Sequence, residues 1–239
     1  MYQLISKNLE QVRVQIAEAA AVVSRNPKDV KLVVVTKGHP IEAVEAALEA
    51  GVRVFGENYA EEGLSKILAC SEWAGVEWHM IGHIQSRKAR IVAENYDWVH
   101  SLDSLKLARR LDRVAGEVGR QLPVLLECNV SGEESKFGFH AWEEEAWPIF
   151  FEQVSQLLEL RNLQIRGLMT MAPFLSNPEQ SRPYFQLLWR LRNRLAQRFA
   201  HLDWRELSMG MSTDFQIAIQ EGATQVRIGT AIMGPRTKL

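Results

Sequence analysis

Hydrophobic and polar positions follow two alternating patterns along this chain. Short apolar runs bounded by polar residues are typical of buried strands, and apolar positions recurring every three or four residues are typical of helices that face a core. The apolar runs predict eight strands: Lys31–Lys37, Arg53–Asn58, Glu77–Gly82, Asp97–Asp103, Pro123–Val130, Gln164–Met171, Arg205–Met211 and Gln225–Met233. The helical spacing predicts eight helices: Tyr2–Ser24, Ile41–Ala50, Ala60–Cys70, Gln85–Asn95, Ser104–Val118, Trp142–Leu160, Pro178–Ala200 and Asp214–Glu221.

Strict alternation of strand and helix predicts a parallel sheet, and eight such units in one domain close most naturally into a (β/α)₈ barrel. We therefore expect an α/β fold, with a single TIM barrel over residues 1–239 and an extra N-terminal helix. After the eighth predicted strand only Pro235 to Leu239 remain, so no eighth helix is expected there. The opening helix, Tyr2–Ser24, is expected to fill that gap on the outside of the barrel.

Composition narrows the class of protein. The 28 basic and 29 acidic residues give a net charge of −1, which provides no basic field for nucleic acid or an anionic membrane. No run of about eighteen apolar residues occurs, and the N-terminus has no signal-peptide pattern. Cys70 and Cys128 are the only cysteines and indicate a reducing compartment rather than a disulfide framework. We expect a cytoplasmic monomer.

One predicted helix carries a local concentration of positive charge. Arg190, Arg192, Arg194 and Arg198 lie within the helix predicted over Pro178–Ala200. A charged run of this kind is usually a solvated helix face, and we interpret it in that way.

Lys37 is the most informative single residue. It stands at the end of the aliphatic run Leu32–Val35, and the carboxyl ends of parallel strands are where barrels place their chemistry. Lysine forms Schiff bases with carbonyl compounds, and partial desolvation lowers its pKa so that more of it is the nucleophilic amine. A solvated loop charge is the ordinary alternative for a lysine at this position.

Two segments near the C-terminus pass from an apolar strand into small and hydroxyl residues. In the first, Ser212 or Thr213 is placed to cap the short helix that follows, which leaves N–H groups and the positive helix end for an anion. In the second, Gly229 admits a ligand close to the backbone and Thr230 offers a hydroxyl. The loops after the last two strands of a barrel often hold phosphate, so these segments together predict a phosphate cup. A capped helix and an ordinary turn are the alternative.

The strand that leads into the second segment also carries a charge. Period-two alternation places Arg227 on the same strand face as Gly229.

Histidines and a polar loop are weaker candidates. His79 and His83 are four residues apart, but a strand turns their rings differently, so no metal site is expected. His79 shares a strand face with Ile81, which places it at the barrel mouth, or else it is a hydrogen-bonded core residue. The segment 129–138 is a long polar excursion and is either a lid or a simple loop.

Several motifs occur in order along the chain. They are Thr36-Lys37 with Pro40, Phe55–Tyr59, Trp78–Gln85, Ser131–Gly138, Gly167–Met171 and Ser208–Gly234. Together they resemble the pyridoxal phosphate homeostasis protein family (YggS/PROSC type). The resemblance covers essentially the whole chain. It implies a barrel similar to the N-terminal domain of alanine racemase. It also implies a protein that binds pyridoxal 5′-phosphate covalently and helps to balance the vitamin B6 pool.

The same resemblance assigns roles to individual positions. Lys37 matches the lysine that forms the aldimine, and Arg227 matches the arginine facing the pyridine nitrogen. The phosphate-contacting positions match Ser212, Gly229 and Thr230. With Asn58 and His79 added, these residues are the candidate cofactor site.

Two classes of function remain open. The first is a carrier that holds the cofactor and passes it to recipient apo-enzymes with little or no catalysis. The alternative is an enzyme, either a pyridoxal phosphate-dependent amino-acid racemase or a Schiff-base aldolase. An always-cationic Arg227 keeps the ring nitrogen unprotonated and weakens the electron sink, and a racemase also needs a second base. Among the tyrosines only Tyr59 lies near a strand end, and no residue is clearly identified as the second base. The carrier is therefore favoured over the racemase.

Overall fold

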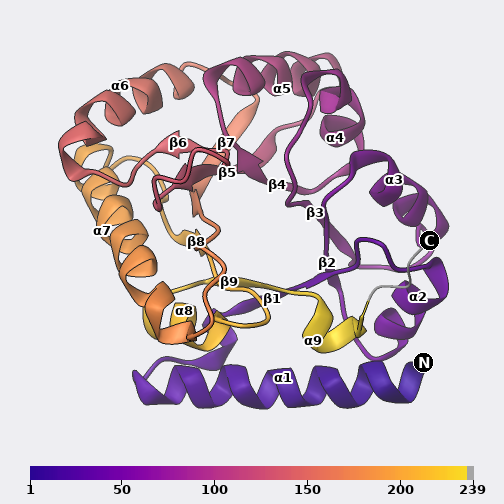
Figure 1. Ribbon diagram of the computed structural model, residues 1–239. Helices are drawn as coiled ribbons and strands as arrows, with labels where there is room; N and C mark the ends of the chain where they lie inside the picture. The colour runs from indigo at the N-terminus through magenta and orange to yellow at the C-terminus, as the bar shows by residue number, and fades with distance from the viewer. Residues whose placement is uncertain (236–239) are drawn as a thin grey trace.

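The computed structural model describes residues 1–235, and its parallel strands close into a barrel (Figure 1). The sheet order is β4-β3-β2-β1-β9-β8-β7-β5-β6, and β4 also pairs with β5, which closes the ring. The eight strands of the ring are β1 (Lys31–Val35), β2 (Val54–Glu57), β3 (Glu77–Met80), β4 (Trp98–Leu102), β5 (Leu122–Asn129), β7 (Leu163–Met169), β8 (Glu206–Ser208) and β9 (Gln225–Ile228). The predicted eight-stranded barrel is confirmed.

Helices surround the barrel on its outside (Figure 1). They are α1 (Tyr2–Val22), α2 (Ile41–Glu49), α3 (Ala60–Ala69), α4 (Ala89–Asn95), α5 (Leu105–Glu117), α6 (Trp147–Leu157), α7 (Arg182–Arg198), α8 (Phe215–Gln220) and α9 (Thr230–Met233). Short 3₁₀ turns, η1 to η4, cover Pro27–Asp29, Ser86–Lys88, Glu144–Ala146 and Pro178–Ser181. Among the described residues no helix is both long and apolar enough to cross a bilayer.

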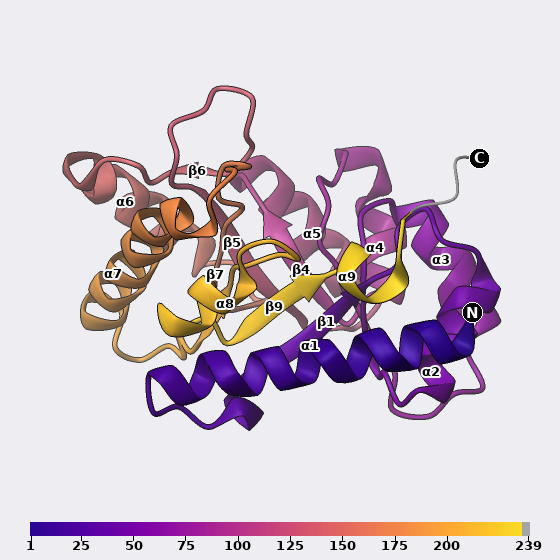
Figure 2. The same ribbon diagram turned by 60° about the horizontal axis from the view of Figure 1, so that its bottom comes forward.

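Helix α1 packs along the outside of the barrel, beside α8, α9 and α2, as expected (Figures 1 and 2). Its buried side chains include Ile5, Leu9, Val12 and Ile16, spaced three or four residues apart so that they form one stripe. Burying each of these large aliphatic groups contributes about 1.5–3 kcal/mol. This stripe holds the opening helix in the position predicted for it.

The end of the last predicted strand is wrong. Strand β9 stops at Ile228, Gly229 precedes the next element with φ −109° and ψ −84°, and Thr230–Met233 form the short helix α9. A helical element therefore does follow the eighth barrel strand. The apolar run after Gly229 is compatible with either period, so its hydrophobicity did not distinguish strand from helix. Of the predicted tail, residues 236–239 lie outside the described part.

The region after β5 also differs from the expectation. A two-residue strand, β6 (Phe139–His140), pairs with β5, and the helix predicted over Trp142–Leu160 is reduced to η3 and α6. The loop between β5 and β6 rises above the carboxyl ends of the strands (Figure 2). Its position is that of the polar excursion predicted over 129–138.

Candidate functional site

The main candidate groups meet at the carboxyl ends of two neighbouring strands. Strands β1 and β9 are paired in parallel, with Val33 opposite Arg227 and Val34 opposite Ile228. Lys37 follows the end of β1 by two residues, and Gly229 and Thr230 follow the end of β9. Residues nearly two hundred positions apart in the sequence are therefore brought side by side.

The loop after β8 reaches the same place. The Ala231 N–H donates to Ser212 Oγ at 3.4 Å, which joins the loop to the first turn of α9. Ser212 and Thr213 do not cap α8 as expected. Asp214 is the N-cap residue, and its Oδ1 accepts a hydrogen bond from the Met211 N–H at 2.7 Å. The Ser212 hydroxyl is thus directed to the other half of the cup.

Arg227 lies inside the barrel, with only 4% of its surface exposed. One guanidinium nitrogen donates to Ser208 Oγ at 2.6 Å and another donates to the Thr170 carbonyl at 2.8 Å. Burial lowers the pKa of Arg227 to about 10, although the nearby carboxylates of Glu127 and Asp214 act in the opposite direction. The group stays cationic at neutral pH and its orientation is fixed by two bonds.

Glu127, on β5, is a buried carboxyl group that no sequence pattern had indicated. Burial raises its pKa to about 7, the Asp103 charge adds to this effect, and Arg227 opposes it. A carboxyl group with a pKa near neutrality is able to give or accept a proton at physiological pH. Because its charge also acts on Arg227, we add Glu127 to the candidate site.

A line of hydrogen bonds runs from Arg227 through the barrel interior. Ser208 Oγ lies 2.9 Å from His100 Nδ1, and His100 Nε2 lies 2.8 Å from His79 Nδ1. His79 Nε2 lies 3.2 Å from the Glu77 carboxylate, which also pairs with Lys31 at 2.8 Å. Glu77 and Lys31 begin their strands, so the line connects the two ends of the barrel.

Every hydrogen bond in this line is donated in the same direction, from Arg227 toward Glu77. Burial lowers the pKa of both His79 and His100, so both rings are neutral at pH 7. The Glu77 carboxylate only accepts, so His79 donates from Nε2 and accepts at Nδ1. His100 then donates from Nε2 and accepts at Nδ1 from the Ser208 hydroxyl. Arg227 only donates, which fits the other end of the same line.

His79 is therefore not at the barrel mouth. It is fully buried with both ring nitrogens hydrogen-bonded, so the core-histidine alternative is the correct placement. His83 lies elsewhere, bonded to Asp103 at 2.9 Å and stacked on Phe137. The described residues contain no group of three or more potential metal ligands.

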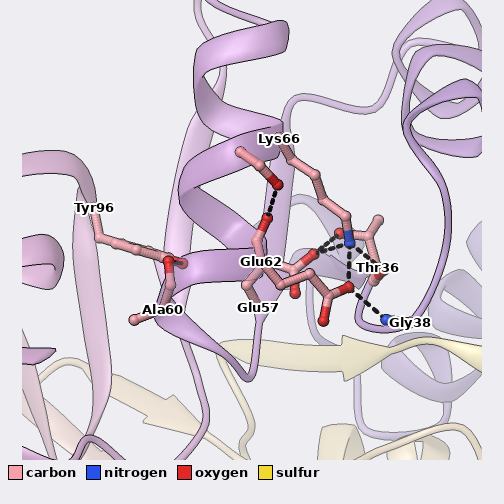
Figure 3. Close-up of polar contacts among 8 residues, drawn as sticks. Thr36, Gly38, Glu57, Ala60, Glu62, Lys66 and Tyr96 are labelled. Atoms are coloured by element: carbon pink, nitrogen blue, oxygen red, sulfur yellow. Dashed lines mark hydrogen bonds and ion pairs between the residues drawn. The ribbon is translucent and has the colours of Figure 1, made fainter.

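A buried ion cluster holds the backbone on both sides of Lys37 (Figure 3). Lys66 Nζ donates to the Thr36 carbonyl at 2.7 Å, to Glu57 at 2.6 Å and to Glu62 at 2.7 Å. Glu57 also accepts from the Thr36 hydroxyl at 2.6 Å. The Gly38 N–H donates to Glu62 at 2.6 Å. Residues 36 and 38 are therefore fixed, and the position of Lys37 between them is determined.

One remaining candidate, Asn58, and a second lysine, Lys136, lie on other loops. Asn58 follows β2, and its buried Oδ1 has no hydrogen-bond partner among the described residues. Lys136 belongs to the raised loop, where its ammonium donates to the Met171 carbonyl at 3.1 Å and pairs with Glu133. Lys136 thus ties this loop to the segment after β7.

These residues fit pyridoxal 5′-phosphate. A lysine, a cup for a dianion and a buried arginine are the three anchors that such a cofactor needs. A Cβ at Gly229 would lie 3.3 Å from the Val35 carbonyl oxygen, a tight contact with the backbone of β1. The unpartnered Asn58 Oδ1 leaves one further acceptor at the mouth.

Comparison with known proteins first gives the class. The family model described as alanine racemase, N-terminal domain, matches residues 8–237. An alanine racemase of Clostridium difficile has the same fold, with a TM-score of 0.70 and 15% identity over 96% of this chain and 56% of that chain. The molecule is thus a barrel of the alanine racemase N-terminal domain class.

Full-length relatives give the particular family. The pyridoxal phosphate homeostasis proteins of Vibrio alginolyticus and Escherichia coli K12 are 42% and 41% identical to the chain, in each case over 97% of both sequences. PipY of Synechococcus elongatus, solved with PLP bound, is 38% identical over 92% of this chain and 100% of its own, with a TM-score of 0.78. The chain belongs to the pyridoxal phosphate homeostasis protein family, as the sequence motifs had indicated.

Proposed function

We propose that this protein binds pyridoxal 5′-phosphate through a Schiff base with Lys37 and acts in vitamin B6 homeostasis as a carrier. The observation that supports the proposal is the β1–β9 pairing, which brings the end of β1, followed by Lys37, next to the end of β9, followed by Gly229 and Thr230. The family to which the chain belongs supports it, and PipY, a 38% identical relative, has been solved with PLP bound.

Each anchor has its own task. Lys37 would hold the cofactor through its amine, which can condense reversibly with an aldehyde and release water. Ser212, Gly229 and Thr230 bind the phosphate dianion through hydroxyl and N–H groups. Arg227 would supply a permanently cationic hydrogen-bond donor for the ring nitrogen. The buried Lys66 cluster keeps the backbone of the Lys37 loop in place.

A racemase is disfavoured on two grounds. Arg227 stays cationic, so it opposes protonation of the ring nitrogen and weakens the electron sink. Tyr59, the one tyrosine considered for the second base, is 62% exposed and stands on a loop. In deuterium oxide with L- or D-alanine, α-proton exchange is expected to fall far below the turnover of about 10 per second that is typical of enzymes. Rapid exchange would establish the racemase and would make Glu127 the first base to test.

The anchor is tested by Lys37→Ala. The purified wild type is expected to be yellow and to retain cofactor after borohydride reduction, whereas an aldolase would be colourless. Lys37→Ala should lose the visible band and the reducible linkage while keeping its fold. Lys136→Ala is the matched control and should keep both. Cofactor fixed to another lysine in the Lys37→Ala protein would show that the anchor is misassigned.

The surface around the mouth suits transient contact with recipient apo-enzymes. Tyr59, Phe137 and Phe174 are 62%, 51% and 87% exposed, and each lies on a loop that follows the carboxyl end of a strand. We propose a monomer that docks through these loops. Light scattering should give the mass of one chain, and Phe174→Ser should slow activation of an apo-enzyme by the loaded protein without changing cofactor binding.

A further inference from the structure

A second concave surface lies at the opposite end of the barrel. A cleft of about 700 Å³ is formed by the end of α1, by α7 and by α8. It also includes Arg205 and Thr224, which immediately precede β8 and β9, so it lies at the amino ends of these strands. The proposed cofactor groups follow the carboxyl ends. The cleft is therefore separate from the cofactor site.

Positive charge dominates the lining. Four arginines, Arg25, Arg190, Arg192 and Arg205, contribute to the cleft, together with one carboxylate, Glu221. That carboxylate is already paired with Arg182, which is outside the lining. Arg190 and Arg205 are likewise paired, with Glu144 at 3.1 Å and with Asp203 at 3.3 Å. Among the described residues, the cations of the lining that form no ion pair are therefore Arg25 and Arg192.

Arg192 is the key residue. Its side chain is half-buried and its Nε is fully buried, yet none of the described residues forms a hydrogen bond or ion pair with it. The interpretation of this helix face as simply solvated therefore fails for Arg192. Burial lowers the pKa of Arg192, and the nearby charge of Arg25 lowers it further. A buried donor without a partner is costly, so such a group calls for an explanation.

Arg25 stands opposite as a fixed cation. Its guanidinium donates to the Ile219 carbonyl at 2.6 Å and to the Ala223 carbonyl at 2.9 Å, so its position is set by the end of α8. A guanidinium presents five N–H donors, and two bonds leave others for a ligand. Neither Arg25 nor Arg192 forms an ion pair with a described carboxylate, although the Asp29 charge acts on Arg25. Two neighbouring cations of this kind favour an anion between them.

The remaining wall is aromatic. Trp189 lines the cleft and is 44% exposed. Gly222 makes room for its indole, since a Cβ at that position would meet Trp189 Cδ1 at 3.0 Å. The indole of Trp189 can therefore stack against a flat ring of a ligand in the cleft.

We propose that this cleft is a second ligand site, which binds the phosphate of a small phosphorylated molecule between Arg25 and Arg192 and stacks its ring on Trp189. ADP is the ring-bearing probe and inorganic phosphate tests the anion alone. The proposal is independent of cofactor chemistry at Lys37.

Calorimetry with ADP and with inorganic phosphate tests the site. Wild type should bind both, and ADP more tightly because of the ring. Arg192→Gln should weaken both by at least about tenfold, since a charge-assisted bond is lost. Arg194→Gln, which removes the same charge from an exposed position of α7, is the matched control and should change affinity by less than about twofold. Trp189→Phe should reduce the advantage of ADP and leave phosphate binding intact.

Thermal unfolding gives an independent readout. In phosphate-free buffer, Arg192→Met should raise the melting temperature, because it removes an unpartnered cation beside Arg25. Added phosphate should stabilise the wild type and not this variant. Equal losses in Arg192→Gln and Arg194→Gln, no binding of either probe, or a lower melting temperature for Arg192→Met would each overturn the proposal. Lys37→Ala should bind ADP as the wild type does, so failure here is distinct from failure of the proposed cofactor function.

Discussion

His79 Nδ1 lies 2.8 Å from His100 Nε2, and both imidazoles are completely buried inside the barrel. Two neutral rings at this distance share a single proton, so the tautomer of one determines the tautomer of the other. The pair connects Glu77 at one end of the barrel with Ser208 and Arg227 at the other. The orientation of the arginine beneath the proposed cofactor is thus linked to a carboxylate at the far end.

The first prediction concerns these tautomers. Nitrogen NMR of the labelled protein should show His79 and His100 each protonated on Nε2 and unprotonated on Nδ1 at neutral pH. The exposed His201 provides the reference signal. The reverse tautomer at either ring would contradict the polarity assigned to the line, since Glu77 accepts and Arg227 donates.

The second prediction concerns the phosphate cup. Ser212→Ala and Thr230→Ala each remove a hydroxyl that is expected to bond a charged phosphate, a bond of about 1.5–3 kcal/mol when buried. Cofactor affinity, measured by titration of the visible band, should therefore fall at least about tenfold in the double variant. Thr213→Ala, on the same loop with an exposed side chain, should leave affinity unchanged. Equal affinity of the wild type for pyridoxal and for its phosphate would refute the cup.

The third prediction concerns the cluster around Lys66. Lys66→Met leaves the fully buried Glu57 without its cation, and breaking a buried pair in this way costs about 3–5 kcal/mol of unfolding free energy. Urea unfolding measures this loss, and the Lys66→Met/Glu57→Gln double variant should recover part of it. Lys88→Met, which removes a surface pair with Glu61, should cost at most about 1 kcal/mol. A similar small loss in both lysine variants would show that the cluster is not structural.

The fourth prediction concerns pH. Burial raises the pKa of Glu127 from 4.5 to about 7, so between these values the folded state binds more protons at this group than the unfolded state does. The contribution of Glu127 to stability is then complete below pH 4.5 and is lost as the pH rises toward 7. The loss amounts to about 3 kcal/mol. Glu127→Gln should flatten the slope of stability in this window, whereas Glu134→Gln, at an exposed position, should preserve the wild-type slope.

The barrel was predictable because the spacing of apolar residues differs between strands and helices, and each element shows its own spacing. The boundaries failed where composition suits both structures, as in the apolar residues after Gly229. The interior line was missed for a different reason: Glu77, His100 and Ser208 come from three strands, and only the register of the closed barrel unites them. Lys66 was missed because its spacing from Glu62 is also that of an ordinary surface pair on a helix.

Because β1 and β9 are neighbours, the barrel can close only late in the synthesis of the chain. A nascent chain acquires Lys37 early, but Arg227, Gly229 and Thr230 only after almost all the other strands have been made. Until that last strand inserts, the barrel is open between β1 and β8, and the proposed cofactor site is incomplete. A ligand that bridges both sides of a seam stabilises the joined state over the open one. If the cofactor binds as proposed, it therefore also stabilises the closed barrel against opening between β1 and β9.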